Sequence, residues 1–141
     1  MTKQEFLAMS YPYEIKLVYR NDKSWPIIMA IGNLDEILHT NKDYKPILRP
    51  LSDLTKEIEH KGEKFVPIEK IREIIGGGWC DVYERAVEVM QEWDIDTLKD
   101  KIKYLPFEFI QLFISWHFDI ADLISKGEAI DVNTLEENPY K

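Results

Sequence analysis

Two Glu-x-x-His pairs are the sharpest chemical signal in this chain: Glu36 with His39, and Glu57 with His60. Pairs with this spacing hold di-iron or di-manganese centres in helical bundles, where both side chains must point into the bundle. On a helical wheel neither pair shares the apolar face of its predicted helix, and His60 lies about 140° from the centre of that face. We therefore expect both pairs to face solvent, with a spacing that arises by chance. The two predicted helices span residues 33–40 and 52–61.

Cys80 is the second candidate, because it follows the glycine run at residues 76–78 and opens a predicted helix. That position favours a reactive thiolate and suits a nucleophile. His117 and Asp119 are the candidate base and orienting group. Residues i and i+2 of a helix diverge by about 200°, so Asp119 cannot orient His117 from the same helix. The preferred interpretation of Cys80 is a small buried thiol, and a cysteine-dependent hydrolase stays open as the alternative.

His117 is the most informative single residue. It lies opposite the polar stripe of a long helix predicted over residues 106–126, among apolar neighbours, so we expect it to be buried. A buried histidine is usually neutral and hydrogen-bonded. A functional role for His117 would need a partner from another element, and the sequence does not identify one. The residues of the polar stripe are Glu108, Gln111, Ser115, Asp119, Asp122 and Lys126.

Two further candidates have simpler interpretations. Asp94 and Asp96 precede a predicted helix, where carboxylates more commonly cap the first turn than hold a cation. The glycine run at 76–78 lacks the Lys-Ser/Thr that follows a phosphate-binding loop. The sequence thus assigns no residue to catalysis, to a cofactor or to a metal.

The fold that positions these residues is predicted to be α+β and mainly α, with an N-terminal β-hairpin. Residues 3–9 predict a short helix. Strict alternation from Tyr13 to Tyr19 predicts a half-buried strand, and a polar turn leads to a second apolar run at 25–31, as in a hairpin. Residues 44–50 should be extended, because a residue before a proline is pushed out of helical geometry.

The hairpin is expected to pack on a helical core built around the long C-terminal helix at 106–126. Pro67 suits the first turn of one core helix, and Asp96 is the expected cap of a short helix that buries Leu98 and Ile102. The other predicted elements are an extended piece at 64–66 and helices at 67–75 and 79–93.

The chain is predicted to be one domain over residues 1–141, because this length is enough to bury a stable core. Within it we distinguish a hairpin-containing part at 1–50, a helical core at 51–127 and a polar tail at 128–141. Everything after Val132 is polar apart from a few side chains, so this tail is expected to fray.

The charge and cysteine content limit the possible functions. With 26 acidic and 18 basic residues the net charge is -8, which disfavours binding to nucleic acid, although a regulator or acidic mimic of nucleic acid stays open. A single cysteine fits a reducing cytoplasm. The N-terminus shows no export signal, and the longest uncharged stretch is about half of the ~20 residues that a membrane-spanning helix needs. We expect no membrane association.

Four segments of the chain resemble small uncharacterised proteins of bacterial prophages and mobile elements. They are KPILRPLSDLT at residues 45–55, GEKFVPI at 62–68, WHFDI at 116–120 and KGEAID at 126–131. The resemblance implies a phage or prophage origin and expression in a bacterial cytoplasm. It implies no activity, ligand or catalytic residue.

The function predicted from the sequence is that of a non-enzymatic accessory or interaction protein. Its expected partner is another protein, or a second copy of the chain bound through the wide apolar face of the helix at 106–126. A Cys80 hydrolase and an acidic nucleic-acid regulator are the alternatives from other functional classes.

Overall fold

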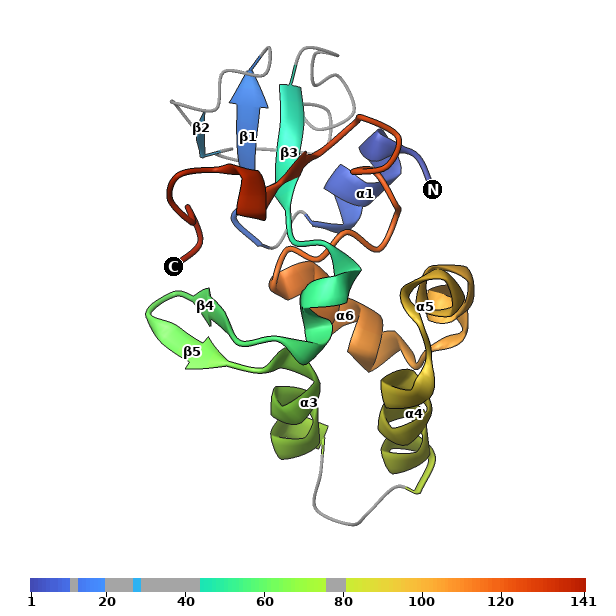
Figure 1. The fold of residues 1–141 in the computed structure, drawn as a ribbon. Helices are drawn as coiled ribbons and strands as arrows, with labels where there is room; N and C mark the ends of the chain where they lie inside the picture. Colours follow the sequence, from blue (N-terminus) through green and yellow to red (C-terminus); the bar gives the residue numbers. More distant parts are fainter. Residues whose placement is uncertain (11–12, 20–26, 29–43, 76–80) are drawn as a thin grey trace.

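The computed structural model describes residues 1–10, 13–19, 27–28, 44–75 and 81–141 (Figure 1). These residues form a mixed α/β structure with five α-helices, a four-stranded sheet and a two-stranded hairpin. The helices are α1 (Lys3–Met9), α3 (Pro67–Ile75), α4 (Asp81–Glu92), α5 (Ile95–Lys101) and α6 (Phe107–Ser115). The strands are β1 (Lys16–Tyr19), β2 (Ile27–Ile28), β3 (Tyr44–Leu48), β4 (Ile58–His60), β5 (Glu63–Phe65) and β6 (Ile130–Asp131). Three 3-10 helices complete the set: η1 (Leu51–Thr55), η2 (Ile102–Tyr104) and η3 (Val132–Thr134).

The four-stranded sheet has the order β2-β1-β3-β6. The predicted N-terminal hairpin is confirmed, since β1 pairs antiparallel with β2 in the register Lys16 to Ile28. The extended segment before Pro50 is also confirmed, and it supplies β3, an inner strand of the sheet. Strand β3 lies between β1 and β6. It pairs in parallel with β6, with Ile47 opposite Ile130. The sheet therefore joins the N-terminal part of the chain to its C-terminal part.

Alternate residues of β1 and β3 enter different apolar clusters, as the two-residue period of a strand requires. Leu17 and Leu48 pack in a cluster that includes Phe6 and Leu7 of α1. The predicted helix at Lys3–Met9 is confirmed, and a capping box between Thr2 and Glu5 begins it. The opposite face of the sheet contributes to a second cluster, in which residues of the two strands pack with residues from the C-terminal part of the chain: Val18, Ile47, Ile130, Val132 and Tyr140.

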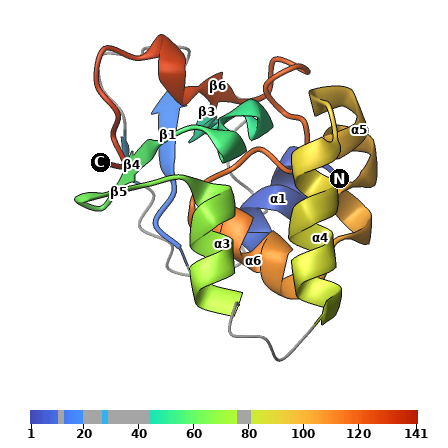
Figure 2. The same cartoon turned by 60° about the horizontal axis from the view of Figure 1, so that its bottom comes forward.

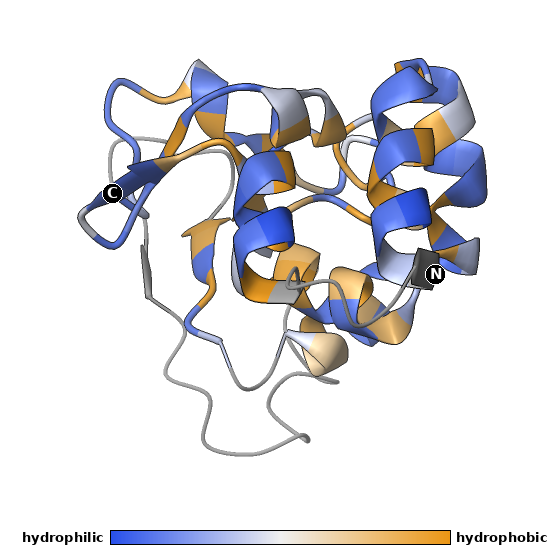
Figure 3. Cartoon of the chain, turned by 90° about the horizontal axis from the view of Figure 1, so that it is seen from below, coloured by the Kyte–Doolittle hydropathy of each residue, from blue (hydrophilic) through white to orange (hydrophobic). Residues whose placement is uncertain are grey.

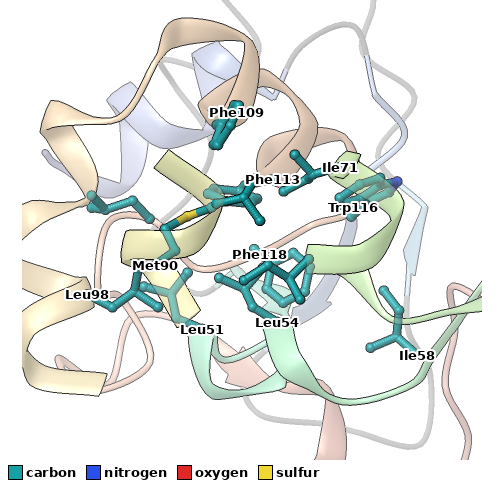
Figure 4. Close-up of a cluster of buried hydrophobic side chains, with 13 residues drawn as sticks. Leu51, Leu54, Ile58, Ile71, Met90, Leu98, Phe109, Phe113, Trp116 and Phe118 are labelled. Atoms are coloured by element: carbon teal, nitrogen blue, oxygen red, sulfur yellow. The ribbon is translucent and has the colours of Figure 1, made fainter. Parts of the chain in front are cut away.

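The largest apolar cluster is built from η1, the helices α3 to α6 and the segments next to them. Figure 2 shows α3, α4 and α6 close to one another. Ile71 of α3 and Met90 of α4 are buried there, whereas Glu69 and Glu88 on the same helices are exposed. Helices α3 and α4 thus carry hydrophobic and hydrophilic residues on different sides (Figure 3). The buried side chains point toward one another in Figure 4. They come from η1, β4, the helices α3 to α6, η2 and the segment that follows α6.

The predicted short helix after residue 94 is confirmed as α5, and its residues Leu98 and the following Ile102 are buried as expected. Its N-cap is Asp94, whose carboxylate accepts a 2.7 Å hydrogen bond from the backbone N–H of Thr97. The cap is therefore two residues earlier than Asp96, the residue that the sequence suggested.

The prediction of a long helix over 106–126 is wrong, because α6 ends at Ser115. The backbone of His117 takes the left-handed conformation, with φ of 63°, and leaves the helical path. The chain then runs beside Arg49, whose N–H donates to the carbonyl of His117 at 2.7 Å and whose carbonyl accepts from the N–H of Asp119 at 2.9 Å. Pairing with the end of β3 thus replaces the continuation of the helix.

The helix predicted over 52–61 is also wrong. A 3-10 helix covers Leu51–Thr55, and residues 58–65 then form the antiparallel hairpin of β4 and β5. Its turn contains Lys61 and Gly62, which both have positive φ, of 50° and 81°. Two consecutive positive φ values match the twist of a tight hairpin, and glycine adopts them without strain. Gly62 therefore turns a hairpin instead of ending a helix, and the predicted extended piece at 64–66 belongs to it.

In the structure the C-terminal residues, for which a fraying tail was predicted, lie against the body of the protein. Ile130 and Asp131 are paired in the sheet, and Tyr140 is 5% exposed. A single buried aromatic side chain thus holds a mostly polar segment against the body of the protein. Within the described ranges, no helix has the length and apolar character needed to cross a membrane.

Candidate functional site

The structure brings together two of the predicted candidate residues and leaves others outside its described part. His39 with its partner Glu36, Cys80 and the glycine run at 76–78 all lie outside the described residues, as does the helix predicted over 33–40. His117 and His60 meet in the interior, with ring centroids 5.6 Å apart. Arg49 and Tyr140 complete this group, and we call these four residues the inner polar cluster: Arg49, His60, His117 and Tyr140.

His117 is 1% exposed, so its predicted burial is confirmed. Its ring is stacked on that of Tyr140, with centroids 4.0 Å apart and an interplanar angle of 20°. Its Nδ1 atom is buried without a hydrogen-bond partner among the described residues. Burial, followed by the positive charges of nearby groups such as Arg49, lowers the pKa of His117 to about 2. The imidazole is therefore neutral throughout the physiological range.

His60 is 8% exposed, which corrects the prediction that it faces solvent. Because residues 58–60 are a strand, Ile58 and His60 share one face, and both are buried while Glu59 between them is half-buried. The Nδ1 atom of His60 lies 3.4 Å from Nη2 of Arg49. Burial, and then the charge of Arg49, lowers the pKa of His60 to about 4. A neutral His60 accepts this hydrogen bond, and a protonated one cannot.

Arg49 links the elements around the cluster and is 2% exposed. Its Nε donates to the carbonyl of Trp116 at 2.9 Å, and its Nη2 donates to the carbonyl of Glu59 at 3.0 Å. The guanidinium thus satisfies the carbonyl at the end of α6 and one in β4 at the same time. Burial lowers its pKa from the usual value.

Tyr140 closes the cluster from the C-terminal side. Its hydroxyl donates to the carbonyl of Ile47 at 2.7 Å and accepts from the N–H of Lys16 at 3.0 Å. Its backbone carbonyl accepts from the N–H of Lys61 at 2.7 Å. Tyr140 therefore joins β1, β3 and the β4–β5 turn, and burial raises the pKa of its phenol.

Asp119 does not orient His117, although the sequence prediction reached this result from a helix that ends before these residues. Its two carboxylate oxygens accept hydrogen bonds of 2.8 Å from the N–H groups of Leu123 and Ile124. The side chain is 4% exposed, and burial raises its pKa while these hydrogen bonds oppose the shift. Asp119 therefore stabilises the turn that follows the end of α6.

The geometry of the cluster fits a structural role. A catalytic imidazole must reach its substrate, whereas both histidines are enclosed and carry depressed pKa values. No group of three or more His, Cys, Asp or Glu side chains in the described part of the chain is placed to hold a metal ion. An open hollow of about 440 Å³ lies next to the cluster, between β4 and the C-terminal segment. Its lining mixes both charges and includes Arg49, Lys56, Glu57 and Asn138.

Two members of the cluster were missed from the sequence. Arg49 sits between two extended residues, in a segment that gives no pattern for a buried charge. Tyr140 had a usable signal, because a lone aromatic residue in a polar segment is a candidate anchor. The comparisons add no further assignment: neither family models, nor curated proteins, nor solved structures give a match to this chain.

Replacing Tyr140 by phenylalanine is expected to lower the free energy of unfolding by about 1 to 2 kcal/mol. The ring keeps its stack on His117, but the carbonyl of Ile47 and the N–H of Lys16 lose their partner. Urea denaturation of the two proteins measures the difference. Replacement of the exposed Tyr104 by phenylalanine is the matched control, and a loss equal to that of the control would contradict the role of the buried hydroxyl.

Proposed function

We propose that this chain is a non-enzymatic accessory protein of phage or prophage type that works through contact with another protein. The observation that carries the proposal is an exposed aromatic pair, Tyr104 at 76% and Phe107 at 68% exposure. The inner polar cluster supports the non-enzymatic part, because its side chains are used to join β1, β3, β4 and α6.

The segments that carry the prophage resemblance support the same interpretation, because three of them adjoin in the fold. The segment at 45–55 pairs with the segment at 116–120 through Arg49 and Phe118. It also pairs with the segment at 126–131 through β3 and β6. What these segments share with the prophage proteins is then a packing unit, which is consistent with a scaffold that presents a surface.

The aromatic pair flanks Pro106, at the corner where η2 ends and α6 begins. Large apolar side chains this exposed are typical of contact surfaces, and aromatic residues are enriched at the centres of protein interfaces. The sequence placed a dimer surface on the apolar face of a long helix. In the structure the buried apolar residues of α6, such as Phe109 and Phe113, lie in the core. Among the described residues, the most exposed large apolar side chains are Tyr104 and Phe107 at this corner.

A second copy of the chain is the partner that the local charge fits best. Two molecules with a net charge of -8 repel each other, so they approach most readily where the charges are balanced. The corner is such a place, because exposed lysines and carboxylates alternate along the sequence between residues 96 and 108, the stretch that contains Tyr104 and Phe107. A two-fold axis would set the lysines of one copy against the carboxylates of the other. The residues are Lys99, Lys101, Lys103, Asp96, Asp100 and Glu108.

Sedimentation velocity over a range of concentrations tests the proposal. We expect a dimer whose fraction grows with protein concentration. The double variant Tyr104→Ser with Phe107→Ser is expected to weaken the dimer by at least about tenfold. Ile74→Ser, at a side chain that is 51% exposed on α3, is the matched control and should leave the dimer unchanged. A wild-type protein that stays monomeric at millimolar concentration would refute this proposal.

A further inference from the structure

The segment after η3 is attached to the body of the protein by one buried side chain. Of residues 135–141, Tyr140 is buried and the others are exposed or half-buried. Leu135 packs, partly buried, against the same apolar cluster as Tyr140, and Nδ2 of Asn138 donates to the carbonyl of Glu59 at 2.8 Å. Withdrawal of this segment would break the hydrogen bonds of Tyr140 to Ile47, Lys16 and Lys61 and the packing of Leu135. The apolar cluster among the helices contains no residue of this segment, so its contacts would remain.

Tyr140 also covers the inner polar cluster. Its ring lies on the face of His117, and its centroid is 6.4 Å from that of His60. While this ring stays in place, it covers one face of the His117 imidazole. When it leaves, the face of His117 on which it stacks becomes accessible.

We propose that residues 135–141 form an acid-sensitive latch, in which protonation of His117 and His60 releases Tyr140 and opens the inner polar cluster to water. The device is separate from the surface at Tyr104 and Phe107. It requires no ligand, since the proton is the signal.

With Tyr140 in place, the inner polar cluster has no acceptor for a positive charge in addition to that of Arg49. A protonated His117 would carry an N–H on Nδ1, where the described residues offer no acceptor. A protonated His60 would turn an N–H toward Nη2 of Arg49. Water in the open state supplies the missing acceptors, so protonation favours opening.

The other charged groups around the histidines act in the same direction, with one exception. Arg49 at the end of β3, Lys61 in the β4–β5 turn and Lys16 on β1 all disfavour a positive charge on His117. Glu63 on β5 is the exception, and it partly offsets the effects of Arg49 and Lys61 on His60. The phenol of Tyr140 stays neutral, because burial raises its pKa.

The sign of the pH dependence follows from these shifts. In the closed state, with Tyr140 stacked on His117, the pKa of His60 is lowered to about 4 and that of His117 to about 2. An exposed histidine titrates near 6.5. The closed state is therefore fully favoured above pH 6.5 and loses its advantage as the pH falls below it. Each histidine that is exposed on opening raises the opening constant by about tenfold per pH unit, down to its pKa in the closed state.

Hydrogen exchange followed by mass spectrometry between pH 7.5 and pH 4.5 tests the latch on the whole protein. After correction for the intrinsic exchange rate, protection of the amides at 135–141 should fall by about tenfold to a hundredfold per pH unit below pH 6.5. Amides of α6 and β3 should exchange far more slowly than those at 135–141 at every pH, because their exchange needs global unfolding. Protection of 135–141 that does not change with pH would overturn the proposal, and so would exchange at 135–141 that is no faster than in α6 and β3.

Variants separate the two histidines. His117→Gln and His60→Gln should each reduce the pH dependence of protection at 135–141 by about tenfold per pH unit, because glutamine does not titrate. Glu137→Gln removes an exposed carboxyl of the same segment and is the matched control, with no change in this pH dependence. Should a glutamine variant fail to fold, NMR titration of Tyr140→Ala decides: the proposal requires the pKa of His117 to rise toward 6.5 in that variant, and an unchanged value refutes it.

Discussion

Replacing Arg49 by methionine is expected to lower the free energy of unfolding by about 3 kcal/mol. Methionine fills much of the same volume but donates no hydrogen bond. The carbonyl of Trp116, at the end of α6, then loses the donor that Nε supplies, and the carbonyl of Glu59 loses one of two donors. A buried acceptor without a donor costs about 1 to 3 kcal/mol. This loss outweighs the gain from removing a buried charge, whose burial penalty is seen in the lowered pKa.

Chemical denaturation measures this change in the free energy of unfolding. Two further variants show which property of Arg49 is responsible for it. Arg49→Lys keeps the charge but cannot span both carbonyls, so its stability should lie between those of the wild type and the methionine variant. Arg72→Met is the matched control, because Arg72 is 45% exposed and makes surface contacts with Glu69 and Gln91. Its loss should stay below about 0.5 kcal/mol. Equal losses in the free energy of unfolding at positions 49 and 72 would show that the buried hydrogen bonds of Arg49 contribute no more to stability than surface contacts do.

Asp119→Ala is expected to cost about 3 kcal/mol, because a single carboxylate satisfies two backbone N–H groups in the interior. Both hydrogen bonds, to Leu123 and Ile124, are 2.8 Å long. Alanine leaves these donors without a partner at a site where water has little access. Asp119→Asn keeps one acceptor oxygen and should lose about half as much. Differential scanning calorimetry and urea denaturation give the comparison.

Asp131 provides the matched control for Asp119. It accepts a 2.9 Å hydrogen bond from the backbone N–H of Asn133, but at an exposed site. Asp131→Ala should therefore cost about 1 kcal/mol or less. A loss at Asp131 as large as that at Asp119 would mean that burial does not set the size of the effect. Because burial raises the pKa of Asp119, its protonation favours the folded state, so the acid sensitivity proposed for the latch does not come from this carboxyl.

Local signals predicted the elements whose ends are marked by residues of special geometry. Pro67 begins α3, and the apolar spacing of Val87 and Met90 identified α4. The prediction of a long helix over 106–126 was wrong for a physical reason. The polar positions at Ser115 and Asp119 continue the helical spacing, although no glycine or proline marks the break. The strain of a left-handed residue at His117 is compensated by long-range pairing with Arg49, which a local pattern does not contain.

The candidate site was predicted only in part for a related reason. His117 was expected to be buried on a helix face, and it is buried although the helix has already ended. His60 was placed on a helical wheel, where its direction differs from that of Ile58. On a strand the two residues share a face, so the wrong period reversed the prediction. Tyr140 approaches the histidines from a segment about 80 residues away from His60, and such a contact leaves no mark in short-range periodicity.

The parallel pairing of β3 with β6 has a consequence for the order of folding. Ile47 and Ile130 are partners, although most of the helical part of the chain lies between them. Closing such a long loop costs chain entropy before any contact repays it, and a parallel pair has no short turn to guide its register. The helices gain their contacts from neighbours in the sequence and can form first. We therefore expect completion of the sheet to be the slow step of folding, with Ile130 and Asp131 as its last strand.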